Sequence, residues 1–220
     1  MGSSIRSVVF DFGGVIISPI TNQISTIATD LECSVDVLRD VLMGPRHESG
    51  SHPWHRLERG EIRQEDLQSL LSPIAEAHGL RWRGDEVERL LSPGQFVLHH
   101  HVLAYIESLR ERGYRTGLLS NSIHEFRPTL EQHAPPSLFD VYVDSSEVGA
   151  RKPEPEIYCV LLDRLEENDP GSVVFLDDFI DNVTGAEAAG LRGLHVRDPI
   201  SALSDLDDLL ASSSNATREP

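Results

Sequence analysis

The segment VVFLDDFIDN places three carboxylates, Asp177, Asp178 and Asp181, directly after an apolar stretch. Adjacent carboxylates repel one another unless a cation, a lysine or a proton lies between them, so this cluster indicates a role beyond solubility. Hard oxygen ligands of this kind favour Mg²⁺. Capping of the following helix, above all by Asp181, is the alternative explanation for part of the cluster.

A single carboxylate, Asp11, follows the apolar stretch SVVF and precedes Gly13 and Gly14. Glycines at this place allow a tight turn and let a ligand approach the backbone closely. An aspartate after a strand is also a common helix or turn cap, so the motif fits either a catalytic or a structural role.

Two further segments carry groups suited to an anion. In GLLSNS, the Ser120 hydroxyl and the Asn121 amide precede a helix N-terminus, where a phosphate or carboxylate binds well. The alternative is capping of the helix that begins near His124. In GARKPEPEIY, Lys152 offers a point charge for an anion, with a solvated surface lysine as the alternative.

The elements that must position these groups follow from the hydrophobic pattern. Five short apolar or β-branched stretches alternate with helical patterns, which predicts an α/β protein with a parallel sheet and crossover helices. The predicted strands are SVVFDF, RTGLLSNS, VYVDSS, SVVFLDD and RGLHVRD. All four motifs lie at the carboxyl ends of these strands, where open α/β sheets bind ligands, so we expect them to meet at one edge.

Residues 19–92 interrupt this alternation and predict helices without a strand, as in VDVLRDVLM and QEDLQSLLSPIAEAHG. A helical insertion after the first strand is the simplest account. The closing segment ASSSNATREP, residues 211–220, is small and polar, and we expect a disordered tail there.

The composition argues against several kinds of partner. A formal net charge of −17 opposes binding to nucleic acid, whose affinity depends on lysines and arginines that replace counterions. No apolar stretch reaches the roughly 18 residues of a membrane helix. Cys33 and Cys159 lie in no metal-binding spacing, and MGSSIRS lacks the apolar centre of a signal peptide. We therefore expect a cytoplasmic protein without nucleic-acid or membrane partners; its oligomeric state does not follow from the sequence.

The motifs together resemble those of the haloacid dehalogenase-like hydrolase superfamily, most of whose members are phosphatases. The resemblance covers the chain in order, through FDFGGVI, LLSNS, RKPEPEIY and FLDDFIDNVTGAEAAGLRG. The segment HPWHRLERGEI is similar to a cap stretch in the subgroup that includes the N-terminal phosphatase domain of soluble epoxide hydrolases. The resemblance implies a Rossmann-like core (residues 1–18 and 93–220) with strand order 5-4-1-2-3 and an all-helical cap (residues 19–92).

The resemblance also implies roles for individual residues. Asp11 would attack phosphorus to form an aspartyl-phosphate, while Ser120 and Lys152 would hold the phosphoryl oxygens. Mg²⁺ would be bound by Asp11, the Gly13 carbonyl and Asp178, with Asp177 in the outer shell or acting through water. The implied substrate is a small phosphorylated metabolite, with Asn121 among the groups that bind it.

At Gly13 the chain departs from the family pattern, which has there a second aspartate that protonates the leaving group. Positioned acid–base help is worth about 10²–10⁴-fold in rate. A cap histidine, among His47, His52 and His55, or a water would then replace this group, unless the leaving group needs little protonation. The alternatives are a regulatory protein that binds metal and phosphate without useful turnover, and a hydrolase acting at carbon.

Other side chains of the helical segment are candidates for substrate contact. Trp54, His55 and Arg59 combine an aromatic ring, an imidazole and a cation, which suit a phosphorylated small molecule, although Trp54 fits the core of the cap equally well. His99, His100 and His101 cannot bind one metal together from a regular helix, because consecutive residues point in different directions. We interpret them as a solvated or partly packed helix start.

Overall fold

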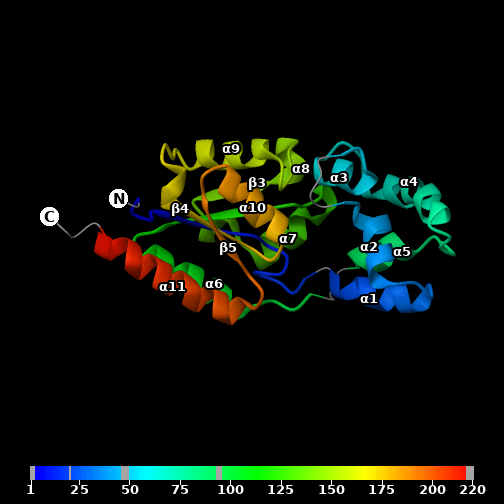
Figure 1. The fold of residues 1–220 in the computed structure, drawn as a ribbon, viewed down its shortest axis with the longest axis horizontal. Coiled ribbons are helices and arrows are strands. Elements are labelled where there is room, and N and C mark those ends of the chain that lie inside the picture. Colours follow the sequence, from blue (N-terminus) through cyan, green and yellow to red (C-terminus); the bar gives the residue numbers. More distant parts are fainter. Residues whose placement is uncertain (1–2, 20, 46–49, 93–95, 217–220) are drawn as a thin grey trace.

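The computed structural model describes residues 3–19, 21–45, 50–92 and 96–216. A parallel sheet with helices on both faces forms one part, and a group of helices lies beside it (Figure 1). The strands are β1 Ser7–Phe10, β2 Arg115–Ser120, β3 Val141–Asp144, β4 Val173–Asp177 and β5 Arg192–His195. Each coincides with one of the apolar stretches that predicted it.

The five strands are all parallel and lie in the order β3-β2-β1-β4-β5. This is the expected order 5-4-1-2-3 counted from the opposite edge, so the predicted fold class is confirmed. In the central strand Phe10 pairs with Leu118 of β2 and with Leu176 of β4. This register brings the carboxyl ends of β1, β2 and β4 to one level.

Alternating side chains of β1 supply two separate apolar layers, because neighbouring residues of a strand point to opposite faces. Val8 and Phe10 pack with residues of helices α6 (His100–Glu111) and α11 (Pro199–Ala216), whereas Val9 packs with residues of α9 (Pro155–Arg164) and α10 (Ile180–Ala188). Both faces of the sheet are therefore buried, as is usual for parallel sheets, and the strands contain continuous apolar runs instead of a polar alternation.

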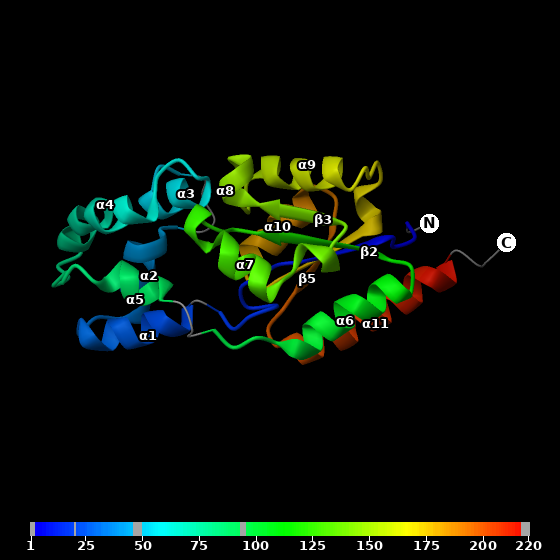
Figure 2. The same ribbon diagram turned by 180° about the vertical axis from the view of Figure 1, so that it is seen from behind.

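The helices of the sheet part lie in these two layers. Figures 1 and 2 show α6 beside α11 on one face and α9 on the other. The helices are α6 His100–Glu111, α7 Arg127–His133, α8 Ser145–Val148, α9 Pro155–Arg164, α10 Ile180–Ala188 and α11 Pro199–Ala216. The amphipathic stripe of α6, with Val102, Ile106 and Leu109 fully buried, explains how this helix covers the sheet.

Residues 21–91 contain only helices among those described, as the sequence predicts. They are α1 Thr21–Asp30, α2 Val35–Met43, α3 Pro53–Glu58, α4 Gln64–Ala77 and α5 Glu86–Leu91. Their buried apolar side chains form a cluster of their own, which Ile123 of the sheet part joins. The domain boundaries stay a prediction, and the second one touches residues 93–95, outside the described residues.

The expectation of a disordered tail from residue 211 is wrong for its first six residues, because α11 continues to Ala216. The reason is a tertiary contact that composition does not reveal. Ser213 is 7% exposed, and its Oγ accepts a hydrogen bond from the backbone N–H of Ile5 at 2.8 Å. Residues 217–220 lie outside the described part of the chain.

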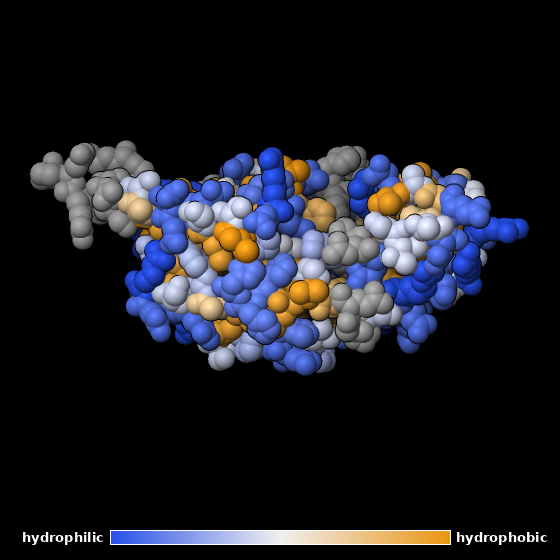
Figure 3. Space-filling view, turned by 90° about the horizontal axis from the view of Figure 1, so that it is seen from below, coloured by the Kyte–Doolittle hydropathy of each residue, from blue (hydrophilic) through white to orange (hydrophobic). Residues whose placement is uncertain are grey.

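The surface seen in Figure 3 is mainly hydrophilic over the described residues, with apolar side chains in small separate groups. The exposed large apolar residues of the described chain are Val35, Val97, Ile180 and Ile200. None of the described helices is both long and apolar enough to cross a lipid bilayer.

Replacing Ser213 by alanine should lower the free energy of unfolding by about 1–2 kcal/mol, because the buried N–H of Ile5 would lose its acceptor. Urea unfolding measures this change. Ser212→Ala is the matched control, since the exposed Ser212 hydroxyl bonds only to Asp208 of its own helix. Equal effects of the two substitutions would contradict the assignment.

Candidate active site

Asp11 follows the last residue of β1 and lies at the carboxyl edge of the sheet. Its backbone N–H donates to Leu176 at 2.9 Å, which continues the pairing with β4, and the residue is 6% exposed. The chain then turns through Gly14, whose φ of +77° favours glycine. A Cβ at Gly14 would lie 2.2 Å from Asp178 Oδ2, so the absence of a side chain also lets the two loops meet.

Lys152 joins the two acidic segments. Its Nζ donates to Asp11 Oδ1 and to Asp177 Oδ2, each at 2.6 Å, and to the carbonyl of Leu119 at 2.9 Å. The side chain is 1% exposed, so this is a fully buried ammonium. The alternative of a solvated surface lysine is wrong, because α9 and its preceding loop fold Lys152 inwards over the sheet edge.

The buried charges shift one another's pKa values. Burial raises the pKa of Asp11 to about 7, because the opposing charge of Lys152 offsets only part of the desolvation cost. Burial alone would lower the pKa of Lys152, but the Asp11 and Asp177 carboxylates raise it above its usual value. Lys152 is therefore cationic, and a further cation beside Asp11 would favour its ionised, nucleophilic form.

The carboxylates of Asp11, Asp177 and Asp178 each offer an oxygen within 4.8 Å of the others. Three carboxylates thus converge where one ammonium is present, and an all-oxygen donor set of this kind suits Mg²⁺. Asp177 already accepts from Lys152, from Asn182 Nδ2 at 3.0 Å and from the backbone N–H of Phe179 at 2.8 Å. The residues fit a divalent cation, with Asp11 and Asp178 as the better candidates for direct ligands.

Ser120 ends β2 and Asn121 follows it, and both line the same pocket as Asp11, Lys152 and Asp178. Ser120 is 3% exposed. Asn121 also holds the backbone of Lys152, because its Oδ1 accepts from the Lys152 N–H at 2.8 Å and its Nδ2 donates to the Lys152 carbonyl at 3.0 Å. Asn121 therefore contacts the loop of Lys152 and does not cap the helix near His124, which was the alternative role.

The rest of the pocket is mainly apolar. It lies between the carboxyl edge of the sheet and the helical group, and Glu58 also lines it. The apolar lining residues are Phe12, Ile17, Pro19, Met43, Trp54, Leu91, Phe96, Ile123, Phe126 and Phe179. Lys152 is the cation among the described lining residues, so the pocket offers one anion-binding end and one apolar end.

The structure separates the three predicted contact residues of the helical segment. Trp54 lines the pocket, whereas His55 and Arg59 do not. His55 is fully buried, and its ring nitrogens have no hydrogen-bond partner among the described residues. The Arg59 guanidinium is engaged by Glu61, Glu154 and the carbonyl of Gly50. Their side-chain directions depend on how α3 packs, which its local pattern does not reveal.

The histidines considered as substitutes for the missing acid are also absent from the described pocket lining. The Nδ1 atom of His52 accepts from the backbone N–H of Trp54 at 3.2 Å, which caps α3. His47 lies outside the described residues. Gly13 lines the pocket, and a Cβ built on it meets no atom within 4 Å, so the position has room for a side chain.

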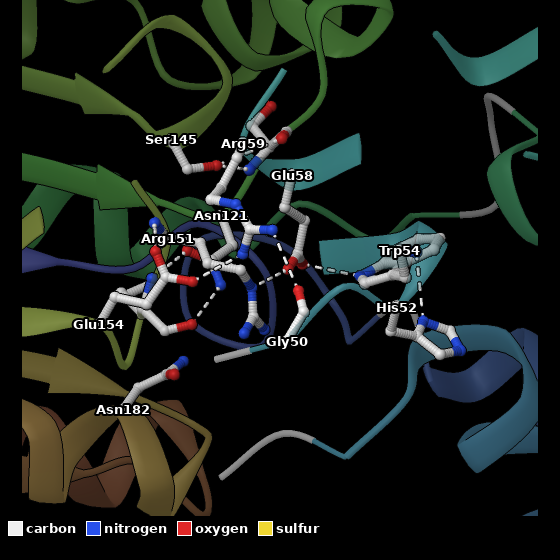
Figure 4. Close-up of polar contacts among 12 residues, drawn as sticks. Gly50, His52, Trp54, Glu58, Arg59, Asn121, Ser145, Arg151, Glu154 and Asn182 are labelled. Carbon is white, nitrogen blue, oxygen red and sulfur yellow. Dashed lines mark hydrogen bonds and ion pairs between the residues drawn. The ribbon is translucent and has the colours of Figure 1, made fainter. Parts of the chain in front are cut away.

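Sequence reasoning missed a group of charged residues around α3 (Figure 4). Glu58 accepts from Trp54 Nε1 at 2.8 Å and from Arg151 Nε at 2.6 Å, and Arg59 donates to Glu154 at 2.8 Å. The spacing of Trp54 and Glu58, four residues apart on a helix, was the available signal. Asn182, which donates to Asp177, lies in the segment FLDDFIDNVTGAEAAGLRG, but the sequence alone assigns it no role.

Comparison with known proteins identifies the class to which this fold and site belong. The sequence model of the haloacid dehalogenase-like hydrolases matches residues 5–190. The chain belongs to this hydrolase family, and the resemblance seen in the motifs is confirmed.

Several relatives match nearly the whole chain. Acyl-CoA dehydrogenase family member 10 of Mus musculus is 30% identical over 95% of this chain and 19% of its own length. Bifunctional epoxide hydrolase 2 of Rattus norvegicus is 27% identical over 93% of this chain and 38% of its own length. Sesquiterpene phosphatase astK of Aspergillus oryzae is 26% identical over 96% and 99% of the two chains. The chain thus spans only part of the first two relatives.

Solved structures support the fold. A haloacid dehalogenase family enzyme of Bacteroides thetaiotaomicron, in complex with magnesium and inorganic phosphate, has a TM-score of 0.60 and 20% identity, covering 87% of this chain and 94% of the other. A dehalogenase with an intermediate complex has a TM-score of 0.67 and 22% identity, covering 96% and 99%.

The burial of His55 predicts acid sensitivity of the fold. Burial lowers the pKa of His55 from 6.5 to about 4, so the unfolded chain binds a proton more readily than the folded one. The free energy of unfolding therefore has its full value above pH 6.5, where the imidazole is neutral in both states. It decreases as the pH falls towards 4, because the unfolded chain gains a proton that the folded chain does not bind. Between pH 7 and pH 5, the free energy of unfolding should fall by about 1–2 kcal/mol more for the unmodified chain than for His55→Phe. Urea unfolding at both pH values measures it, and an unchanged difference would contradict the prediction.

Proposed function

We propose that this chain is a Mg²⁺-dependent phosphatase that forms an aspartyl-phosphate at Asp11. The observation that carries the proposal is the buried Lys152 ammonium, bonded to Asp11 and Asp177 beside the carboxylate of Asp178. A phosphoryl group that approaches an anionic nucleophile needs compensating positive charge, and phosphoryl-transfer enzymes achieve most of their catalysis by such charges and by positioning.

In the proposed reaction an Asp11 carboxylate oxygen attacks phosphorus, and the bond from phosphorus to the leaving oxygen breaks. Lys152 and Ser120 hold the phosphoryl oxygens. Mg²⁺ bound by Asp11, the Gly13 carbonyl and Asp178, with Asp177 in the outer shell, would supply further positive charge. Water then hydrolyses the aspartyl-phosphate, which releases phosphate and restores Asp11. Because Gly13 offers no proton, water protonates the leaving oxygen.

The pocket supports a phosphomonoester with a largely apolar organic group as substrate. Beyond the anion-binding end, the lining is aromatic and aliphatic, including Trp54, Phe96 and Phe126. Among the described lining residues Lys152 is the cation, so a second phosphate would find no further positive charge in the lining. The name of one relative, a sesquiterpene phosphatase, agrees with a substrate of this kind. The cytoplasmic location, the helical cap, and the absence of nucleic-acid and membrane partners stay predictions.

The two alternatives have less support. Dehalogenases, which act at carbon, are among the proteins of similar fold, but at 22% identity the similarity supports the fold alone. The three converging carboxylates favour a metal-assisted reaction instead. A regulatory protein would use the same metal and phosphate groups, and turnover distinguishes it from an enzyme.

The first test is phosphate release from a panel of phosphomonoesters that includes an activated aryl phosphate and alkyl phosphates of increasing chain length. We expect Mg²⁺-dependent turnover that rises with apolar chain length and that Asp11→Asn lowers by at least about 10³-fold, since the nucleophile is lost. Mg²⁺-dependent stabilisation of the fold without turnover above the Asp11→Asn background would overturn the phosphatase and favour the binding protein.

Gly13→Asp should increase turnover of phosphomonoesters with poor leaving groups by about tenfold or more, because it supplies a carboxyl group able to donate a proton. The backbone at Gly13 shows no positive φ, and an added Cβ meets open space, so the fold should tolerate the change. The activated aryl phosphate should gain less, because its leaving group needs little protonation.

Gly13→Asn is the matched control for this substitution, with nearly the same shape and no acidic proton. If Gly13→Asp and Gly13→Asn have the same kcat on alkyl phosphates, acid catalysis at this position is refuted. A different group would then protonate the leaving oxygen.

A further inference from the structure

Two ion pairs connect α3 with the segment that carries Lys152 (Figure 4). Glu58 Oε2 accepts from Arg151 Nε at 2.6 Å, and Arg59 Nη1 donates to Glu154 Oε1 at 2.8 Å. In the chain, Arg151 directly precedes Lys152 and Glu154 follows two residues later. The end of α3 therefore holds this segment on both sides of the lysine.

Both pairs are shielded from water. The exposed fractions are 7% for Glu58 and 2% for Arg151 in one pair, and 13% for Arg59 and 8% for Glu154 in the other. Removing one partner of a buried pair leaves an uncompensated charge, which is far more costly than the loss of a surface pair. The docked position of α3 thus depends on these four side chains.

The same contacts reach the backbone at Lys152. Glu154 Oε2 accepts from the backbone N–H of Arg151 at 3.1 Å, while its Oε1 accepts from Arg59. One carboxylate therefore bonds both α3 and the peptide next to Lys152. Asn121 holds the Lys152 peptide groups from the other side.

The position of α3 also shapes the pocket. Asp11, Ser120 and Lys152 are 6%, 3% and 1% exposed, and α3 contributes Trp54 and Glu58 to the lining of the same pocket. The docking of α3 therefore affects the space beside these groups.

The α3 side of both pairs is held by further contacts. Arg59 also bonds Glu61 at 2.6 Å, and Glu58 also accepts from Trp54 Nε1 at 2.8 Å. These contacts fix Glu58 and Arg59 in the positions from which they reach Arg151 and Glu154.

We propose that Glu58, Arg59, Arg151 and Glu154 form a latch that couples the docking of α3 to the placement of Lys152. Arg59 and Glu154 lie outside the pocket and act as positioning residues in this latch. The inference goes beyond the proposed function, since it concerns how α3 and the segment of Lys152 hold each other and not the reaction in the pocket.

The indole N–H of Trp54 reports the state of the latch, because it donates to Glu58 inside the buried network. The chain contains two tryptophans, Trp54 and Trp82, so two indole signals are expected in a ¹H–¹⁵N spectrum, and Trp82→Phe assigns them. When closing is fast relative to exchange, the hydrogen-exchange rate of a protected N–H is proportional to the open fraction.

Arg59→Gln and Glu154→Gln should each accelerate exchange of the Trp54 indole by about tenfold or more, with Trp82 unchanged. Arg59→Lys keeps the charge and should stay within about twofold of the unmodified chain. Glu167→Gln is the matched control, because it removes the 2.5 Å ion pair with Arg6 at the opposite edge of the sheet and should leave Trp54 unchanged. Unaltered Trp54 exchange in both Gln variants would overturn the latch.

Coupling to Lys152 is tested with inorganic phosphate and Mg²⁺ as the probe. Phosphate held by Lys152 should slow Trp54 exchange in the unmodified chain, and by a clearly smaller factor in Glu154→Gln, because linkage between two sites is reciprocal. Equal slowing in both chains, or none in either, would overturn the coupling. Hydrogen exchange of the Trp54 indole without phosphate can be measured whether or not the chain turns over a substrate. The latch and the proposed phosphatase activity are therefore tested independently.

Discussion

The buried ammonium of Lys152 between two carboxylates is the interaction on which the arrangement of the site depends. A lysine that is 1% exposed is stable only where opposite charges and hydrogen bonds replace its hydration. Asp11 and Asp177 supply those charges from the two neighbouring strands β1 and β4, and Leu119 of β2 supplies a carbonyl. The parallel order of the sheet is what makes this possible, because it brings the carboxyl ends of three strands, far apart in the sequence, to the same level.

The parts of the structure that sequence predicted well are those governed by local pattern and sheet topology. The five apolar stretches became strands, and Asp11, Ser120, Asp177 and Asp178 came together because each ends or directly follows a strand of one parallel sheet. The directions of His55 and Arg59 were missed because they lie in, and directly after, a short helix whose docking decides what they face. The helical end of α11 was missed because its small polar residues are ordered by Ser213 reaching Ile5, a partner 208 residues away.

The net negative charge of this protein repels an approaching anion at long range. With a formal net charge of −17, the field around the molecule repels a phosphate until it reaches the local charge of Lys152. Since the pocket walls are mainly apolar, burial of an organic group offers the compensating attraction. Affinity for such a ligand should then increase with salt, which screens the repulsion and leaves the apolar contacts intact.

The hydrogen bond between Ser213 and Ile5 places the first strand and the last helix side by side at the amino edge of the sheet, away from the pocket (Figure 1). Because Ile5 and Ser213 are neighbours, a short linker can join the segments that carry them, and new ends can be opened in a surface loop without disturbing the strand order. The fold is thus suited to circular permutation.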